Sequence, residues 1–101
     1  MGFEHISSRR NKLIREAAAL AASAERRRGE ARFLCEGARL CEDAARSGVQ
    51  IDRCFFTEQA QRRYGEYLNR ILPAAQEQFL VEEHVADLLS STRNSQGIFL
   101  S

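Results

Sequence analysis

Arginines are the residues in this sequence best suited to binding an anionic partner. Fourteen of the fifteen basic residues are Arg, whose planar guanidinium suits phosphate better than the ammonium of Lys does. Arg26, Arg27 and Arg28 stand in a row, Arg32 follows them, and Arg15 lies upstream on the matching face of a predicted helix. This cluster could hold several phosphates of a nucleic acid, or it could be an ordinary solvated helix end. The spacing alone leaves both interpretations open.

A second candidate site lies where a predicted strand turns into a helix. Glu36, Gly37 and Arg39 occupy this turn. Open α/β sheets usually bind ligands at the carboxyl ends of their parallel strands, and a helix N-terminus there offers N–H groups to a phosphate. Gly37 could equally provide backbone freedom and Glu36 could stabilise the helix dipole, so the turn by itself fits either role.

Side chains that support catalysis or hold a metal are sparse. His5 and His84 have no Cys or His at ligand spacing, and His5 is expected in a frayed terminus. Cys35, Cys41 and Cys54 form no C-x-x-C pair and are predicted to be small buried residues. No serine lies in a G-x-S-x-G or S-x-x-K motif, and no Gly-rich loop resembles a nucleotide cradle. The residues therefore predict no catalytic, cofactor or metal site in this chain.

The composition predicts one small folded domain. The chain has 101 residues, of which 44% are hydrophobic and 29% charged, and its net charge is +1. The charges are segregated: residues 9–32 carry eight basic and three acidic side chains, whereas residues 77–87 carry four acids and no Arg or Lys. Neither a long apolar run nor a secretory leader is visible, so we expect a cytoplasmic protein that does not bind a membrane.

Hydrophobic periodicity predicts helices that alternate with strands. Ser7 or Ser8 should cap a helix that ends near Arg27, and Thr57 should cap a later helix that ends at Pro73. The other predicted elements are strands at 31–35, 51–56, 78–81 and 97–100, a helix from about 38 to Gly48, and a helix at 82–89. We therefore predict an α/β fold, a three-layer α/β/α sandwich of about four mostly parallel strands with an extra N-terminal helix. The expected division is a basic helix at 1–29 and an α/β domain at 30–101.

Four sequence blocks in order resemble one known family. Ile6-x-Ser8-x-x-Asn11-x-x-Ile14-Arg15 opens the chain, and Phe33-Leu34-Cys35-Glu36-Gly37-x-Arg39-Leu40 follows the basic run. Phe55-Phe56-Thr57-Glu58 comes next, and Leu89-Ser90-Ser91-Thr92 precedes Gln96-Gly97-Ile98. Together they resemble the N-terminal substrate-binding domain of SpoU/TrmH-type RNA 2′-O-ribose methyltransferases. Ser95 departs from the family pattern, where Pro is common, so a looser final turn is expected.

This resemblance implies a fold shared with RNA-binding ribosomal proteins and a partner that is structured RNA, ribosomal RNA in preference to transfer RNA. It implies that the S-adenosylmethionine pocket and the catalytic residues belong to a further domain, expected after residue 101, through which the full-length enzyme would dimerise. This chain would be the non-catalytic part of that methyltransferase and would hold no cofactor itself. Combined with the residue patterns, it assigns RNA binding to a set of eight residues: Arg15, Arg26, Arg27, Arg28, Arg32, Glu36, Gly37 and Arg39.

A rival hypothesis comes from another class of protein. The chain could be an interaction module that docks on its catalytic domain or dimer partner, with arginines that only solvate the surface. Charge reversal at Arg26 and Arg27 would then leave RNA binding by the complete enzyme unchanged. A small stand-alone enzyme is a third possibility, which fails because no catalytic constellation is visible.

Overall fold

The computed structural model describes residues 3–22 and 34–101 of the chain. In these residues five strands form one sheet, in the spatial order β1-β4-β3-β5-β2. Their bounds are β1 (Glu4–Ile6), β2 (Cys35–Glu36), β3 (Ile51–Phe56), β4 (Ala75–Val81) and β5 (Ile98–Leu100). The β1–β4 and β3–β4 pairs are parallel, while β5 pairs antiparallel with both β3 and β2. The predicted α/β class is confirmed, with one more strand than expected and with β5 reversed.

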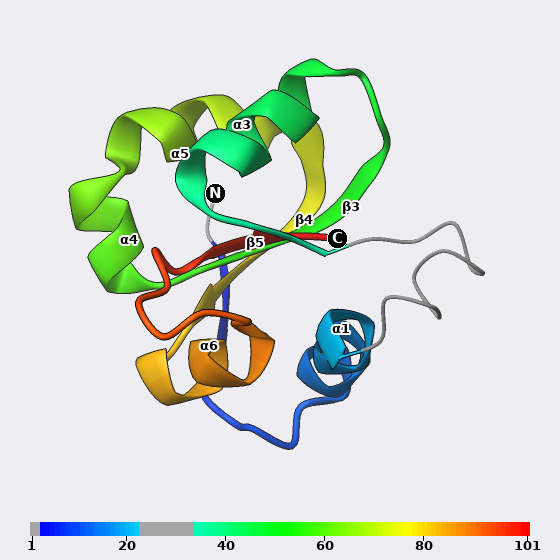
Figure 1. Ribbon diagram of the computed structural model, residues 1–101, viewed down its shortest axis with the longest axis vertical. Helices are drawn as coiled ribbons and strands as arrows, with labels where there is room; N and C mark the ends of the chain where they lie inside the picture. The colour runs from blue at the N-terminus through cyan, green and yellow to red at the C-terminus, as the bar shows by residue number, and fades with distance from the viewer. Residues whose placement is uncertain (1–2, 23–33) are drawn as a thin grey trace.

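Helices cover both faces of the sheet (Figure 1). The described helices are α1 (Lys12–Ala22), α3 (Ala38–Arg46), α4 (Glu58–Arg63), α5 (Gly65–Ile71), the 3-10 turn η1 (Leu72–Ala74) and α6 (Glu83–Leu89). Helices α1 and α6 lie on one face, and α3 and α5 lie on the other (Figure 1). The molecule is therefore the predicted three-layer sandwich.

Alternating side chains of the central strands supply two separate cores. On β3, Cys54 and Phe56 pack against α3 and α5, whereas Phe55 between them packs against α1 and α6. Strand β5 alternates in the same way, since Ile98 and Leu100 share the first core and Phe99 belongs to the second. All these side chains are fully buried. Because both faces of the sheet are covered by helices, β3 and β5 need apolar side chains on both faces, and this explains their continuous apolar runs.

The N-terminal segment differs from its prediction. His5 lies in strand β1, which pairs with β4, and its Nε2 lies 2.7 Å from the Glu82 carboxylate. Asn11 caps α1 instead of Ser7 or Ser8, because its Oδ1 accepts a hydrogen bond from the backbone of Leu13 at 2.8 Å. The serines precede a turn in which Ser8 Oγ accepts from the Arg10 backbone at 3.1 Å. Polar residues before a helix offer several local caps, and the pairing of β1 decides which one is used.

The helix predicted to run from Thr57 to Pro73 is divided in two. Thr57 is the N-cap as predicted, and its buried hydroxyl accepts from the Ala60 backbone at 3.0 Å. Helix α4 ends at Arg63, the backbone of the following Tyr64 leaves helical geometry, and α5 begins at Gly65. Glycine in a helix interior is destabilising, which favours a break at this point. The break leaves Tyr64 half-buried at a corner between two helices.

Residues 4–22 and 34–101 contribute to the same sheet and the layers on it. The boundary expected between residues 29 and 30 lies outside the described residues. None of the described helices is long and apolar enough to cross a membrane.

Candidate nucleic-acid interface

Four strands end at one edge of the sheet, which we call the carboxyl edge. Strands β1, β2, β3 and β4 all run toward it, and the antiparallel strand β5 begins there. Two hydrogen bonds join three segments at this edge: Gly37 donates to the Ile98 carbonyl at 2.9 Å, and Thr57 donates to the Gly97 carbonyl at 3.1 Å. The β2–α3 turn, the start of α4 and the loop at 90–97 therefore form one connected surface.

Glu36 fastens the loop at 90–97 to the β2–α3 turn. Its Oε2 accepts hydrogen bonds from the hydroxyls of Ser90 at 2.6 Å and Thr92 at 3.3 Å. Its Oε1 accepts from the backbone of Ser91 at 3.0 Å and from the Ser91 hydroxyl at 3.1 Å. Both oxygens are thus engaged by the loop, in hydrogen bonds strengthened by the negative charge.

The pKa of Glu36 reflects these contacts. Partial burial raises the pKa of this carboxyl, but hydrogen bonds from Ser90, the Ser91 backbone, Ser95 and the Ser91 hydroxyl outweigh burial. The net effect holds the pKa of Glu36 below its ordinary value of 4.5. The carboxylate form is therefore the one that this loop stabilises.

Gln96 forms a second link between the loop at 90–97 and the start of α3. Its Oε1 accepts from the Ala38 backbone at 2.7 Å, so one N–H at this helix end is already used. Gly37 has φ of +106°, and a Cβ there would lie 3.4 Å from the same Oε1. This combination of a left-handed backbone and a near neighbour explains why glycine occupies the turn.

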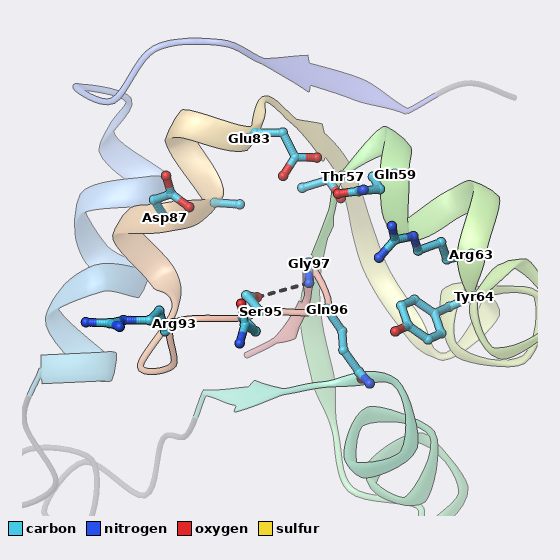
Figure 2. A pocket seen from close by; sticks show the side chains of 12 residues that line it. Thr57, Gln59, Arg63, Tyr64, Glu83, Asp87, Arg93, Ser95, Gln96 and Gly97 are labelled. Carbon is cyan, nitrogen blue, oxygen red and sulfur yellow. Dashed lines mark hydrogen bonds between the residues drawn. The ribbon is translucent and has the colours of Figure 1, made fainter.

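Gly97 closes the loop against Thr57. Its φ is +78°, and a Cβ there would lie 2.5 Å from Thr57 Oγ1. The Gly97 backbone donates to Ser95 Oγ at 3.0 Å, a bond drawn in Figure 2. The turn expected to be loose at Ser95 is therefore closed by the serine itself.

Two hollows flank the loop at 90–97. The β2–α3 hollow has a volume of about 620 Å³, and its lining residues are Leu34, Glu36, Gly37, Leu40, Ser91, Thr92, Arg93, Asn94 and Gln96. The α4–α6 cleft, with about 470 Å³, lies on the other side (Figure 2). Its lining residues are Thr57, Gln59, Arg63, Tyr64, Glu83, Ala86, Asp87, Arg93, Asn94, Ser95, Gln96 and Gly97. Both volumes lie in the range typical of small-molecule sites, roughly 300–1,000 Å³.

The structure brings together part of the predicted site. Glu36 and Gly37 line the β2–α3 hollow, and Arg39 is exposed in the first turn of α3 beside it. Arg15 is exposed in α1, which belongs to the layer on the opposite face of the sheet from α3. The other four predicted RNA-binding residues, Arg26, Arg27, Arg28 and Arg32, lie outside the described residues.

Sequence reasoning did not include the loop itself in the site. Ser90, Thr92 and Gln96 belong to the closing sequence block, but nothing in their spacing pairs the first two with Glu36, or Gln96 with the Ala38 backbone, 54 or more positions earlier. Arg63 and Tyr64 were also missed, because one unbroken helix from Thr57 to Pro73 was predicted. Both side chains line the α4–α6 cleft beside the break between α4 and α5 (Figure 2).

The cysteines occupy the interior, as predicted. Cys41 and Cys54 are fully buried and Cys35 is partly buried, all three as free thiols. Burial raises the pKa of Cys54 to about 12 and raises that of Cys41 further, with neighbouring Cys35 and Cys54 adding to the shift at Cys41. Within residues 3–22 and 34–101, no cluster of three His, Cys, Asp or Glu side chains could hold a metal ion.

A family model and three solved methyltransferase structures are similar to this chain. A family model described as the MRM3-like substrate binding domain matches residues 11–100. A solved RNA 2′-O ribose methyltransferase is 28% identical, with a TM-score of 0.75 over 95% of this chain and 36% of its own. An rRNA methyltransferase from Sinorhizobium meliloti is 20% identical, with a TM-score of 0.72 over 97% of this chain and 36% of its own. An AdoMet-bound form from that organism is similar at 20% identity and a TM-score of 0.71, over 97% of this chain and 35% of its own.

The chain therefore spans about a third of the length of these structures. At 20% identity the two S. meliloti structures establish a shared fold only. A comparison with curated protein sequences finds no match.

Proposed function

This chain belongs to the MRM3-like substrate binding domain family. We therefore propose that it binds structured RNA and so positions one ribose for a 2′-O-methyltransferase domain of the same protein. The resemblance identified in the sequence is confirmed by this family and by the related methyltransferase structures. The observation that carries the proposal is the connected carboxyl edge, where Glu36 and Gln96 hold the loop at 90–97 in one arrangement. A surface held in place in this way can recognise the shape of an RNA without first becoming ordered.

The side chains around the β2–α3 hollow suit an RNA with an irregular backbone. Arg93 is exposed in the lining of this hollow, and Arg39 is exposed next to Leu40 in the first turn of α3, so both can contact phosphates. Leu34 and Leu40 supply an apolar surface for a base. RNA-binding proteins read splayed, unpaired regions more readily than paired helices, whose deep groove excludes side chains. In this proposal Glu36 acts through the loop that it holds. Arg15 and the arginines between residues 26 and 32 remain proposed phosphate contacts.

Methyl transfer is proposed for a domain outside this chain. One of the similar structures is an AdoMet-bound rRNA methyltransferase, of which this chain matches 35%. S-adenosylmethionine would supply the methyl group in that domain, and the complete protein would act in the cytoplasm on ribosomal RNA in preference to transfer RNA. A homodimer through that domain remains part of the proposal.

Binding to a bulged RNA hairpin under increasing salt tests the proposal. If about four or five phosphates are neutralised, log affinity falls with log salt at a slope of roughly −3 to −4. Arg39→Gln and Arg93→Gln should each reduce this slope by about 0.7. Arg46→Gln is the matched control, because Arg46 is exposed at the far end of α3. An unchanged slope in both test variants, or no binding at low salt, would refute RNA binding at this edge.

One observation favours the rival docking function. The Leu40 side chain is 57% exposed and lines the β2–α3 hollow together with Leu34, which gives this hollow an apolar part that another protein domain could cover. Docking on another protein domain predicts that Leu40→Ser abolishes that association while Arg39→Gln and Arg93→Gln leave RNA binding by the complete enzyme unchanged. RNA binding at the carboxyl edge predicts that the arginine variants weaken it.

A further inference from the structure

The α4–α6 cleft carries opposite charges on facing walls. Figure 2 shows Glu83 on α6 above Gly97, and Arg63 and Tyr64 at the end of α4 to the right of it. Among the described residues, the ion pairs involve other side chains, and neither Arg63 nor Glu83 takes part in one. Two charges that face a common space without pairing leave both available to a ligand between them.

The ligand that fits these walls has three parts. Arg63 calls for an anionic group, Tyr64 offers an aromatic ring to a flat partner, and Glu83 accepts hydrogen bonds from N–H donors. A nucleotide combines a phosphate, a planar base and a base edge that can carry donors. The cleft volume of about 470 Å³ is sufficient for a ligand of this class.

The hydrogen-bonding capacity of Glu83 also indicates which base fits the cleft. A carboxylate accepts two parallel hydrogen bonds when its partner presents adjacent donors. Guanine does so through N1–H and the N2 amino group, whereas uracil has a single N–H, and adenine and cytosine each place one amino group beside an acceptor. The acidic wall formed by Glu83, with Asp87 one turn later on α6, therefore favours guanine.

The cleft is continuous with the proposed RNA surface. Asn94 and Gln96 line both the β2–α3 hollow and the α4–α6 cleft, so a strand bound in the hollow reaches the cleft across the loop. A nucleotide must leave its helix to enter, which costs least where it is already unpaired.

We propose that the α4–α6 cleft takes one unpaired guanosine of the bound RNA, with its phosphate on Arg63, its base against Tyr64 and its N1–H and N2–H groups on Glu83. This assignment rests on the proposed RNA-binding function and adds to it a site that reads one base. The guanosine is a recognition nucleotide held by this domain.

The direction in which RNA affinity changes when Glu83 is neutralised distinguishes two possible roles of this acid. A surface acid that only lies near RNA repels phosphates, so its removal tightens binding. An acid that accepts hydrogen bonds from a base does the opposite, because its removal loses those bonds. Glu83→Gln should therefore weaken binding to a hairpin with a single bulged guanosine and leave binding to the same hairpin with bulged uridine equal or tighter.

Fluorescence anisotropy with four hairpins measures this effect, the bulged nucleotide being guanosine, inosine, adenosine or uridine. The wild-type chain should bind the guanosine hairpin on the order of tenfold more tightly than the uridine hairpin. Inosine lacks the N2 amino group and should fall between them. Glu83→Gln should abolish the preference, and Tyr64→Leu should weaken all four complexes.

Glu66→Gln is the matched control, since Glu66 is an exposed acid in the first turn of α5 outside the cleft. It should retain the guanosine preference. Thermal unfolding of each variant verifies that it is folded.

The outcomes separate the two proposals. Tight, salt-dependent binding of all four hairpins without preference, together with tighter binding by Glu83→Gln, overturns the guanosine site and leaves RNA binding standing. Failure of every hairpin to bind at low salt overturns the proposed function itself. Chemical-shift changes at Ser95 and Gly97 caused by free glycine but not by guanosine monophosphate would assign the cleft to an amino acid and overturn the nucleotide proposal.

Discussion

The Glu36 carboxylate and the Ser90 hydroxyl, 54 positions apart in the chain, are joined by a hydrogen bond of 2.6 Å. This contact connects the β2–α3 turn, which sequence reasoning placed in the site, with a loop that it did not. The Ser91 backbone donates to the same carboxylate at 3.0 Å, so the loop is held by its main chain as well as by its hydroxyls. One partly buried glutamate therefore contributes several of the hydrogen bonds that shape the proposed RNA surface.

Replacing Glu36 by Gln should loosen this loop. The amide keeps one acceptor oxygen but loses the charge that strengthens the bonds from Ser90 and Ser91. Because the side chain is partly exposed, we expect the free energy of unfolding to fall by about 1 kcal/mol. Urea unfolding measures this change. Glu58→Gln, which removes an exposed pair with Arg62, is the control and should cost less than about 0.5 kcal/mol. Equal losses in the two variants would contradict a special role for Glu36.

The contribution of Glu36 should depend on pH. Its pKa in the folded chain lies below 4.5, whereas the unfolded chain has the ordinary value. A lowered folded-state pKa stabilises the fold above the unfolded pKa, and this stabilisation is lost as pH falls toward and through the folded pKa. The difference in unfolding free energy between wild type and Glu36→Gln should therefore be constant near pH 7 and shrink below about pH 4.5. A difference that grows on acidification would show that the carboxylate is not the stabilised form.

Gly97→Ala should be the most damaging of three glycine substitutions. The new Cβ would lie 2.5 Å from Thr57 Oγ1 on a backbone with φ of +78°, so it combines a clash with strain. We expect a loss of roughly 2–4 kcal/mol in unfolding free energy. Gly48 has a similar φ of +86° with no atom near the position of a new Cβ. Gly48→Ala therefore measures the backbone strain alone and should lower the free energy of unfolding by about 1 kcal/mol. Gly65→Ala meets no neighbour and has no positive φ, so it should be neutral or stabilise by up to about 1 kcal/mol. Any other order in urea unfolding would contradict the described turn.

The thiols should be unreactive in the folded chain. Cys54 has a pKa of about 12 and Cys41 a still higher one, so almost no thiolate exists at pH 8. Burial also raises the pKa of Cys35. An aromatic disulfide reagent should label the native chain slowly and all three cysteines rapidly in urea. Fast native labelling of Cys41 or Cys54 would show that this core opens readily.

Much of the fold could be predicted because its signals are local. The apolar run at 51–56, the Thr57 cap and the left-handed Gly48 after α3 are encoded within a few residues of one another, and each is found in the structure. The four family blocks likewise lie in short contiguous strings. From these the sequence by itself determined an α/β sandwich, its family, and a turn at Glu36 and Gly37 as a candidate site.

Only the tertiary structure decided which distant segments meet. Strand β1 is three residues long and has no strand pattern of its own, since it exists by pairing with β4 more than 70 positions later. Strand β5 lies between β3 and β2 and runs antiparallel to both, and periodicity encodes neither its place nor its direction. The cleft between α4 and α6 and the contact of Glu36 with Ser90 arise in the same way. A hydrogen bond or a cavity depends on positions in space, whereas spacing along the chain reports only which face of its own element a residue occupies.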